Sequence, residues 1–296
     1  MACTLDFLDD PAEFLDAAGE HLAADPVLST VVATNASRLV RERESGVAAP
    51  EDFPQWWLVV RDAAGEVVGA GMRTAPFEPH PPYLLAMPDD AAAQLARELH
   101  ARGEELGGVN GALPAARVAA EEYARLVGRT ARVHEETRLF ELGELVEPEL
   151  PEGQLRMATV DDLDLALEWY LSFGREAAEQ AGRDDEHALF EDGAGMLRRI
   201  QEGRVWFWVD ERGERVHLTG HNLPSFGVAR IGPVFTPKGH RGNGYASAAV
   251  AEVSRMLRDA GSRVTLFTDQ ANPTSNAIYQ RIGFRAVVDQ ANLVIE

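Results

Sequence analysis

Cysteine is nearly absent from the sequence, because Cys3 is the only one among 296 residues. A single thiol cannot form a disulfide within the chain, and it cannot build a thiolate cluster for structural zinc. No stretch approaches the roughly 18 apolar residues of a membrane-spanning helix. The first residues also lack the basic segment and the long apolar run of a secretory signal. We therefore expect a cytoplasmic protein that does not enter a membrane.

Positive charge is also scarce: 28 Lys and Arg side chains stand against 48 Asp and Glu, and the formal net charge is −20. Proteins bind nucleic acid largely by neutralising phosphates with Lys and Arg, so this balance argues against a nucleic-acid partner. An acidic surface steers cationic or amine substrates, but it also simply keeps a protein soluble. Lys238 is the only lysine in the chain.

The length fits two domains of about 150 residues each. Near the midpoint lies a short acidic segment, residues 146–153, which contains Pro148 and Pro151. Its composition is typical of an interdomain linker. We therefore predict one domain over residues 1–145 and a second over residues 154–296.

Two segments half a chain apart share one pattern. Residues 57–69 and 205–217 each alternate large apolar residues around an acidic turn, which predicts a β-hairpin in both places. An offset of 148 positions superimposes Gly65 on Gly213, and it also places residues 86–88 on 234–236. This match indicates an internal duplication, although two unrelated α/β domains could share the same spacing.

The halves also agree further along. Each hairpin is followed by a predicted helix, over residues 91–102 and 245–259, and each half ends near a helix that carries a tyrosine, Tyr123 or Tyr279. The pattern predicts a mixed α/β (α+β) fold with a largely antiparallel sheet flanked by helices. In the second half it predicts helices at about 163–179, 187–201, 245–259 and 274–280, the first capped by Asp161, and strands at 155–158, 205–209, 216–221, 229–235, 263–267, 285–288 and 292–295.

A glycine-rich loop separates the predicted strand that ends at Thr236 from the helix that begins near Gly244. The first amides of a helix have no partner within the helix and carry the positive end of its dipole. Glycines before the helix let a phosphate approach the backbone closely. Three basic residues add positive charge in an acidic chain: Lys238, His240 and Arg241. The segment therefore predicts an anion site.

Two familiar phosphate loops do not fit. A Walker loop ends in Gly-Lys-Ser/Thr, whereas this segment reads Gly244-Tyr245-Ala246. A dinucleotide fingerprint needs Gly-x-Gly-x-x-Gly early in a parallel βαβ unit, but Ser247 stands at the third position and a hairpin precedes the loop.

A third pattern does fit. The six residues Arg241-Gly242-Asn243-Gly244-Tyr245-Ala246 resemble the acyl-CoA pyrophosphate signature of the GCN5-related N-acetyltransferase family, which is Gln/Arg, two residues, Gly, one residue, Gly/Ala. Residues 266–269 and 272–284 resemble the later motif of that family almost residue for residue. The resemblance covers about 140 residues. It implies an N-acetyltransferase domain with acetyl-CoA as co-substrate, and together with the internal duplication it implies two tandem domains of this fold.

The resemblance also implies roles for particular residues. In this family the pantetheine arm lies in a gap between two strands, which assigns it to Val234, Phe235 and Thr236. The pyrophosphate would be held by the amides of Arg241, Gly242, Asn243, Gly244, Tyr245 and Ala246. The other side of the cofactor would be lined by Asn272, Ser275 and Asn276. Tyr279 stands at the position of the general acid, and an amide near Val234 would stabilise the oxyanion.

The general base stays open at this point. The predicted strand that ends at Phe235 carries no acid, whereas His217 and His221 alternate with Thr219 on one face of the preceding strand. Either histidine could reach the site, and either could instead be structural. Scattered His and Asp residues lack metal-ligand spacing, so no metal is predicted.

If the first half is a copy of the second, its glycine-rich loop has been lost. Residues 86–92 contain no glycine and no basic residue, and Asp89 and Asp90 would repel phosphate, so we expect them to cap a helix. We predict that this half binds no CoA, that Tyr123 packs in its interior, and that it buries surface of the second domain or shapes its substrate cleft. Its layout resembles that of mycothiol synthase, a tandem member with one degenerate half.

We therefore expect an enzyme, an N-acetyltransferase that acts on a primary amine of a small molecule or a peptide by direct attack. The alternatives are acetylation of a sugar-linked amine as in mycothiol synthase, a non-catalytic acyl-CoA-binding regulator, and an interaction module with a vestigial loop. A monomer or a homodimer is expected. The acceptor pocket would be built from residues 169–191, which carry no readable code.

Overall fold

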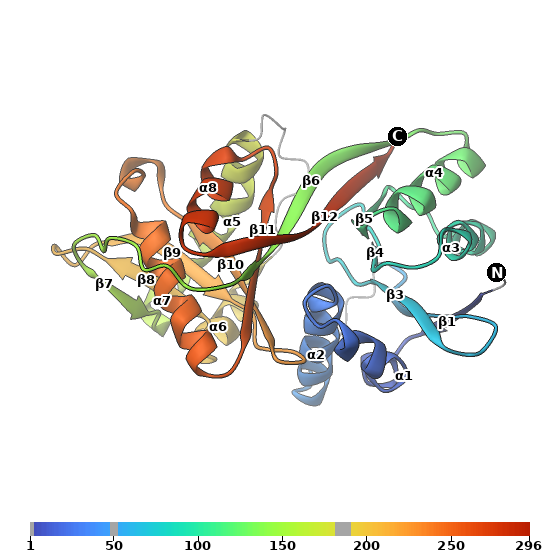
Figure 1. Cartoon of the computed structure of the whole chain (residues 1–296), viewed down its shortest axis with the longest axis horizontal. Coiled ribbons are helices and arrows are strands. Elements are labelled where there is room, and N and C mark those ends of the chain that lie inside the picture. Colours follow the sequence, from blue (N-terminus) through green and yellow to red (C-terminus); the bar gives the residue numbers. More distant parts are fainter. Residues whose placement is uncertain (1–2, 48–52, 181–190) are drawn as a thin grey trace. The chain divides into compact units, whose positions relative to one another are not determined.

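The computed structural model describes residues 3–47, 53–180 and 191–296, and the chain forms two compact units (Figure 1). The first unit contains Met1–Thr137 together with Val288–Glu296, and the second contains Arg138–Val287. The end of the chain thus belongs to the first unit, although the sequence-based division placed it in the second. Residues 143–153, which include the predicted linker, contain neither helix nor strand.

The two halves of the chain have the same order of elements. The first half consists of β1 (Thr4–Leu8), α1 (Pro11–Ala24), α2 (Thr30–Glu44), β2 (Trp56–Arg61), β3 (Val67–Arg73), β4 (Tyr83–Leu84), α3 (Asp89–Ala101), β5 (Gly108–Ala112), α4 (Ala115–Val127) and β6 (Ala131–Leu142). The second consists of β7 (Gln154–Met157), α5 (Leu163–Gln180), α6 (Gly193–Gln201), β8 (Val205–Val209), β9 (Arg215–His221), β10 (Val228–Phe235), α7 (Tyr245–Asp259), β11 (Arg263–Asp269), α8 (Pro273–Arg281) and β12 (Phe284–Ile295). Short 3₁₀ helices, η1 (Val160–Asp162) and η2 (Lys238–His240), precede α5 and α7.

The two hairpins agree in register as well as in position. Val60 pairs with Gly69 in the first half and Trp208 pairs with His217 in the second, and both ladders shift register at the next pair. Each turn is closed by an aspartate, Asp62 or Asp210, whose Oδ1 accepts two backbone amides two and four residues on. The offset of 148 therefore holds for the strand pairs and for the turn hydrogen bonds in this region, which confirms the tandem arrangement.

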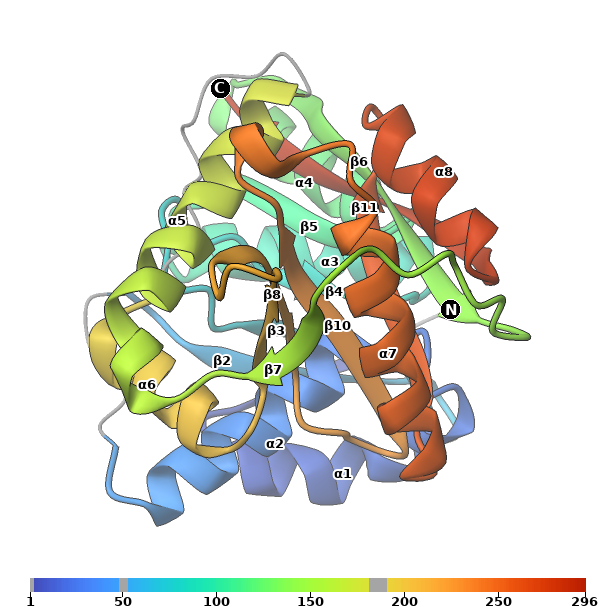
Figure 2. The same cartoon turned by 90° about the vertical axis from the view of Figure 1, so that its left-hand side faces the viewer.

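Each unit places two helices on either face of its strands. In the first unit, β2 is buried on both faces, since Trp57 and Val59 pack with α1 and α2 while Leu58 and Val60 pack with α3 and α4. The second unit repeats this arrangement with α5 and α6 on one face and α7 and α8 on the other (Figure 2). A strand covered on both faces is expected to be apolar throughout, as the run 56–60 is.

The last strand of each half pairs in the other half's sheet. The strand order is β1-β2-β3-β4-β5-β12 on one side and β6-β11-β10-β9-β8-β7 on the other. β5 therefore pairs with β12, from Ala112 opposite Gln290 to Gly108 opposite Val294, and not with the strand that follows it in sequence. Beside β11, the Arg263 guanidinium pairs with the Glu141 carboxylate of β6 at 2.6 Å. The two last strands are reciprocally exchanged.

Four local predictions need correction. β12 is one continuous strand, and the turn expected at 289–291 is absent because Gln290 and Ala291 take part in the ladder with β5. α6 begins at Gly193 behind Asp192, which caps it, while residues 187–190 of the predicted helix lie outside the described ranges. The helix α3 has Pro88 as its N-cap without a side-chain cap, so Asp89 and Asp90 lie in its first turn.

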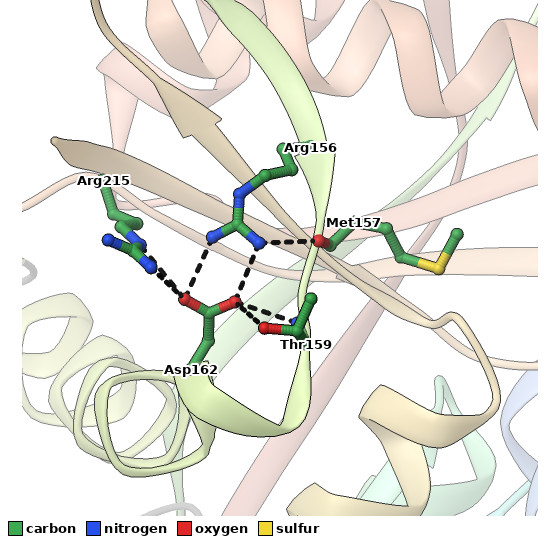
Figure 3. A network of polar contacts seen from close by, with 5 residues as sticks. All are labelled: Arg156, Met157, Thr159, Asp162 and Arg215. Atoms are coloured by element: carbon green, nitrogen blue, oxygen red, sulfur yellow. Dashed lines mark hydrogen bonds and ion pairs between the residues drawn. The ribbon is translucent and has the colours of Figure 1, made fainter. Parts of the chain in front are cut away.

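The fourth correction concerns the start of α5, where Asp162 and not Asp161 is the capping acid (Figure 3). The Asp162 carboxylate accepts two hydrogen bonds from Arg156 and two from Arg215, and it also accepts the amide and hydroxyl of Thr159. Burial raises the pKa of Asp162, but these hydrogen bonds outweigh it and hold the pKa well below its usual range. The network ties the start of α5 to β7 and β9.

None of the helices in the described part of the chain has the length and apolar composition needed to cross a bilayer.

Candidate active site

A gap opens between two central strands of the second unit. β10 and β11 run parallel and pair from Val228 opposite Arg263 to Ile231 opposite Leu266. Beyond that pair both strands continue, to Phe235 and to Asp269, without pairing with each other. The ladder between β10 and β9 also shifts at this point and resumes at Val234. The ends of the two strands therefore splay apart.

The splayed strands open into a cleft of about 420 Å³. Its walls come from the end of β10, the glycine-rich loop, the start of α7, the helix α8 and the middle of α5. Twelve of the thirteen residues predicted for the site line this cleft: Val234, Phe235, Thr236, Arg241, Gly242, Asn243, Gly244, Tyr245, Ala246, Asn272, Ser275 and Tyr279. Residues that are up to 45 positions apart in sequence are thus brought to one place.

The glycine-rich loop is shaped for a ligand that approaches its backbone. Gly242 and Gly244 have φ angles of +83° and +81°, in the left-handed region that favours glycine. A Cβ built on either residue would meet no atom of the described chain within 4 Å. Gly244 is the N-cap of α7 and supplies no side-chain acceptor, so the first amides of the helix face the cleft without a side-chain cap.

A second helix begins at the same cleft. Asn272 is the N-cap of α8, and its Oδ1 accepts a hydrogen bond of 3.1 Å from the Ser275 amide. The positive ends of two helix dipoles therefore lie at one cleft, which favours an anion there. Asn276 is the thirteenth predicted residue and does not line the cleft. Its amide instead bonds the Thr268 hydroxyl and the carbonyls of Asp269 and Asn272, which holds β11 to α8.

Tyr279 lies on α8 and lines the cleft. Its side chain is buried, with 7% of the residue exposed. Its ring packs edge-on against Phe284 at 6.0 Å. Burial raises the pKa of Tyr279, so the phenol keeps its proton at neutral pH. A buried, protonated phenol beside a cleft is suited to donate a proton.

Neither candidate base lines the cleft. His217 is completely buried, with Nδ1 2.7 Å from the Thr236 hydroxyl and Nε2 2.6 Å from the Thr219 hydroxyl. Burial lowers its pKa to about 3, so the imidazole is neutral. His221 is 9% exposed, and its Nδ1 lies 3.2 Å from the Asn222 carbonyl oxygen. Both histidines are held by structural hydrogen bonds.

The cations of the loop are occupied by carboxylates. Arg241 donates from Nε to the Thr236 carbonyl at 3.0 Å and also pairs with Glu176, while Lys238 pairs with Glu179 at 2.7 Å. The charge expected from these two residues is thereby largely balanced, so an anion bound here would be held mainly by backbone amides.

Two cleft residues on α5, Phe173 and Glu176, fall in the range 169–191 predicted for the acceptor pocket but were not singled out individually. They follow Trp169, which packs on Phe207 and Phe235 from the same helix. Phe173 lies four residues after Trp169, and Glu176 lies three residues after Phe173, so the three share one face of the helix. This spacing could have identified both residues once Trp169 was placed in the core.

The equivalent connection in the first unit is shorter. Only four residues, 85–88, connect β4 to α3, whereas nine residues, 236–244, connect β10 to α7. Leu85 and Met87 are buried there. Tyr123, the counterpart of Tyr279, is buried as predicted: its hydroxyl donates to the Glu104 carbonyl at 2.7 Å and accepts the Leu106 amide at 3.3 Å. The hydroxyl proton of Tyr123 is therefore already used in a hydrogen bond within the first unit.

Comparisons with known proteins bear on this geometry. Residues 212–293 match the family model described as FR47-like protein. Among solved structures, a GCN5-related N-acetyltransferase from Sphaerobacter thermophilus is similar over 98% of this chain and 94% of its own, at 18% identity and a TM-score of 0.56. A GNAT-family acetyltransferase from Colwellia psychrerythraea is similar over 99% of both chains, at 10% identity and a TM-score of 0.56.

A third structure decides the arrangement. A tandem GNAT protein from the clavulanic acid biosynthesis pathway is similar over 99% of this chain and 98% of its own, at 16% identity and a TM-score of 0.54. The chain has the tandem fold of the GCN5-related N-acetyltransferases. The resemblance drawn from the motifs is therefore confirmed at the level of the fold, over both halves. No curated protein matches the sequence. The residue roles taken from this family stay predictions.

Proposed function

We propose that the chain is an acetyl-CoA-dependent N-acetyltransferase that acylates a primary amine of a small molecule or a peptide by direct attack. One observation carries the proposal: an uncapped helix start behind two positive-φ glycines faces the same cleft as a buried, protonated phenol. The first feature suits a pyrophosphate, and the second suits a thiolate leaving group. Their coincidence in one splayed-strand cleft is what acyl transfer from a CoA thioester requires.

The residues present fit this co-substrate. The amides from Gly242 to Ala246 would hold the pyrophosphate, and the end of β10 from Val234 to Thr236 would run beside the pantetheine arm. The cleft is lined by the cations Arg241 and Arg281 and, among the described residues, by one carboxylate, Glu176. The bound acetyl-CoA supplies the activated acetyl group.

The chemistry is a single exchange at the acyl carbon. The neutral amine forms the new C–N bond, the C–S bond breaks, and one amine proton passes to solvent water, which returns a proton to Tyr279 after the step. Tyr279 gives its proton to the departing sulfur, whose free thiol has an ordinary pKa near 8.5. His217 and His221 are buried away from the cleft, so the proposal assigns neither of them as the base.

A second candidate function has an observation in its favour. Neither histidine lines the cleft, and its only described carboxylate pairs with Arg241. An acyl-CoA-binding regulator without turnover would look the same. Assays of acetyl transfer with panels of small amines and peptides separate the two, because the regulator binds acetyl-CoA yet releases no CoA with any amine.

The test of the proposal is a calorimetric titration of acetyl-CoA into the wild type, Gly244→Glu and Gly213→Glu. Both glycines have a φ of +81° and open space at the Cβ, so both substitutions cause the same backbone strain. Only Gly244→Glu places a carboxylate where the pyrophosphate would lie. We expect about 100-fold or greater weakening in Gly244→Glu, from charge repulsion and steric block, and wild-type binding in Gly213→Glu. Absence of binding by the wild type would sink the proposal.

A further inference from the structure

Thr236 stands where β10 meets the glycine-rich loop, and it is held from two sides. Its carbonyl accepts a hydrogen bond of 3.0 Å from Arg241 Nε. Its hydroxyl lies 2.7 Å from Nδ1 of His217, and Nε2 of the same ring lies 2.6 Å from the Thr219 hydroxyl. Thr236 lines the cleft, whereas His217 and Thr219 are completely buried. Three side chains thus form a row that begins in the core and ends at the cleft.

The direction of the hydrogen bonds in this row follows from the rule that buried donors are satisfied. A neutral imidazole has one N–H and one acceptor nitrogen. Within the described chain, the hydroxyl of Thr219 has His217 as its only hydrogen-bond partner, so its proton must go to Nε2. The ring proton is therefore on Nδ1, and Nδ1–H donates to the Thr236 oxygen.

This direction leaves the hydroxyl proton of Thr236 for a partner outside the row. We propose that Thr219, His217 and Thr236 form a directed relay that makes the Thr236 hydroxyl a hydrogen-bond donor to an acceptor oxygen of the acyl-CoA. The proposal rests on the proposed function and adds a side-chain contact to the backbone contacts expected from the fold. Thr236 is the binding residue, and His217 is a positioning residue that acts through it.

The degenerate half supplies an internal comparison. At the offset of 148, the positions of His217, Thr219 and Thr236 are occupied by Gly69, Gly71 and Pro88. A Cβ at Gly69 would lie 2.4 Å from the Met87 Cβ, so no side chain could stand there. The half that lacks the phosphate loop thus also lacks every member of the relay, while the hairpin that would carry it is kept in register.

The relay is tested first by its tautomer. In the wild type at pH 7, two-bond ¹H–¹⁵N correlation spectra of the imidazole should show His217 protonated on Nδ1 alone. A ring protonated on Nε2, or on both nitrogens, overturns the relay. This measurement needs no ligand, so it stands even if acetyl-CoA does not bind, whereas failure of the wild type to bind acetyl-CoA removes the assigned ligand together with the proposed function.

The contact is tested by calorimetry with acetyl-CoA. We expect Thr236→Val to weaken binding about three- to tenfold, the range of one neutral hydrogen bond, and Thr236→Ser to stay within about twofold of the wild type. His217→Leu should weaken binding by a similar factor, and the double variant with Thr236→Val should be no weaker than either one, because both act through one hydroxyl. Additive losses, or wild-type affinity in a folded Thr236→Val, contradict the proposal.

Two further variants separate positioning from damage to the fold. Thr265→Val removes another buried hydroxyl, 3.4 Å from the Ala229 carbonyl and outside the cleft lining, and should leave affinity unchanged. His217→Gln keeps one donor and one acceptor and should recover affinity relative to His217→Leu. If His217→Leu does not fold, His217→Gln and Thr236→Val carry the cycle, and loss of affinity in Thr265→Val equal to that in Thr236→Val overturns the proposal.

Discussion

The two halves of this chain share their hairpins to the register and differ in the loop that follows. β2–β3 and β8–β9 pair residue for residue at a constant offset, including the bulge and the aspartate-closed turn. Nine residues then join strand to helix in the second half, against four in the first. The comparison teaches that strand pairing preserves the fold, while the site depends on a short loop and a few side chains beside it.

The largest expected effect comes from cutting the chain within residues 146–153. The fragment 154–296 would lose β6, the neighbour of β11, and the fragment 1–153 would lose β12, the neighbour of β5. We expect neither fragment alone to show cooperative thermal unfolding by circular dichroism. Co-expression should restore both the transition and acetyl-CoA binding. A fragment 154–296 that binds acetyl-CoA with full-length affinity would contradict the strand exchange.

The two tyrosines should respond in opposite ways. Tyr279→Phe removes the proposed acid and should lower kcat by a factor of about 10² to 10⁴ with little change in acetyl-CoA affinity. Tyr123→Phe should leave kcat unchanged and cost about 1–3 kcal/mol of stability, because the Glu104 carbonyl and Leu106 amide lose a buried partner. Steady-state kinetics and urea unfolding of both variants check this. Equal kcat for Tyr279→Phe and the wild type would support the regulator instead.

His217 should give the second half a pH dependence that Gly69 cannot give the first. Burial holds its pKa near 3 in the folded state, below the ordinary 6.5, so the unfolded chain binds more protons between these values. Stability should therefore be complete above pH 6.5 and fall by about 1.4 kcal/mol per pH unit as the pH drops toward 3. Urea unfolding at pH 7 and pH 5 should show a steeper loss of stability in the wild type than in His217→Gln, which keeps only the contributions of other groups such as His221 and His21, whose pKa values burial also lowers. Identical slopes would refute it.

The smallest effect is expected in the first-half loop. Asp89→Asn combined with Asp90→Asn removes the charges that would repel phosphate, but the connection stays four residues long and its Leu85 and Met87 stay buried. Calorimetry should give one acetyl-CoA per chain for this variant and for the wild type, with affinities within about twofold. A stoichiometry of two would break the distinction between the halves.

Much of the fold could be predicted because its determinants are local. The alternating residues around Gly65 and Gly213 define the hairpins, and the run from Arg241 to Ala246 defines the loop. The cleft is lined by residues that the sequence motifs already identify, such as Ser275 and Tyr279.

The rest depends on spatial neighbours that sequence spacing does not show. The pairing of β12 with β5 joins Leu293 to Val109, far apart in the chain and without any local signal. Asn276 lies within the motif, but its side-chain amide donates to the carbonyls of Asp269 and Asn272 and does not line the cleft. The sequence does not show which way this side chain points. His217 looked like a candidate base until burial and two threonines showed it to be a neutral, bonded ring.

The reciprocal exchange of last strands has a consequence for inheritance. A gene that kept only the half with the glycine-rich loop would encode β12 without its partner β5, and β11 without its partner β6. The exchanged pair also leaves no room for a side chain where Gly108 meets Val294, since a Cβ at Gly108 would lie 2.4 Å from the Leu293 carbonyl oxygen. Both halves would therefore have to be inherited together for either set of strands to be complete.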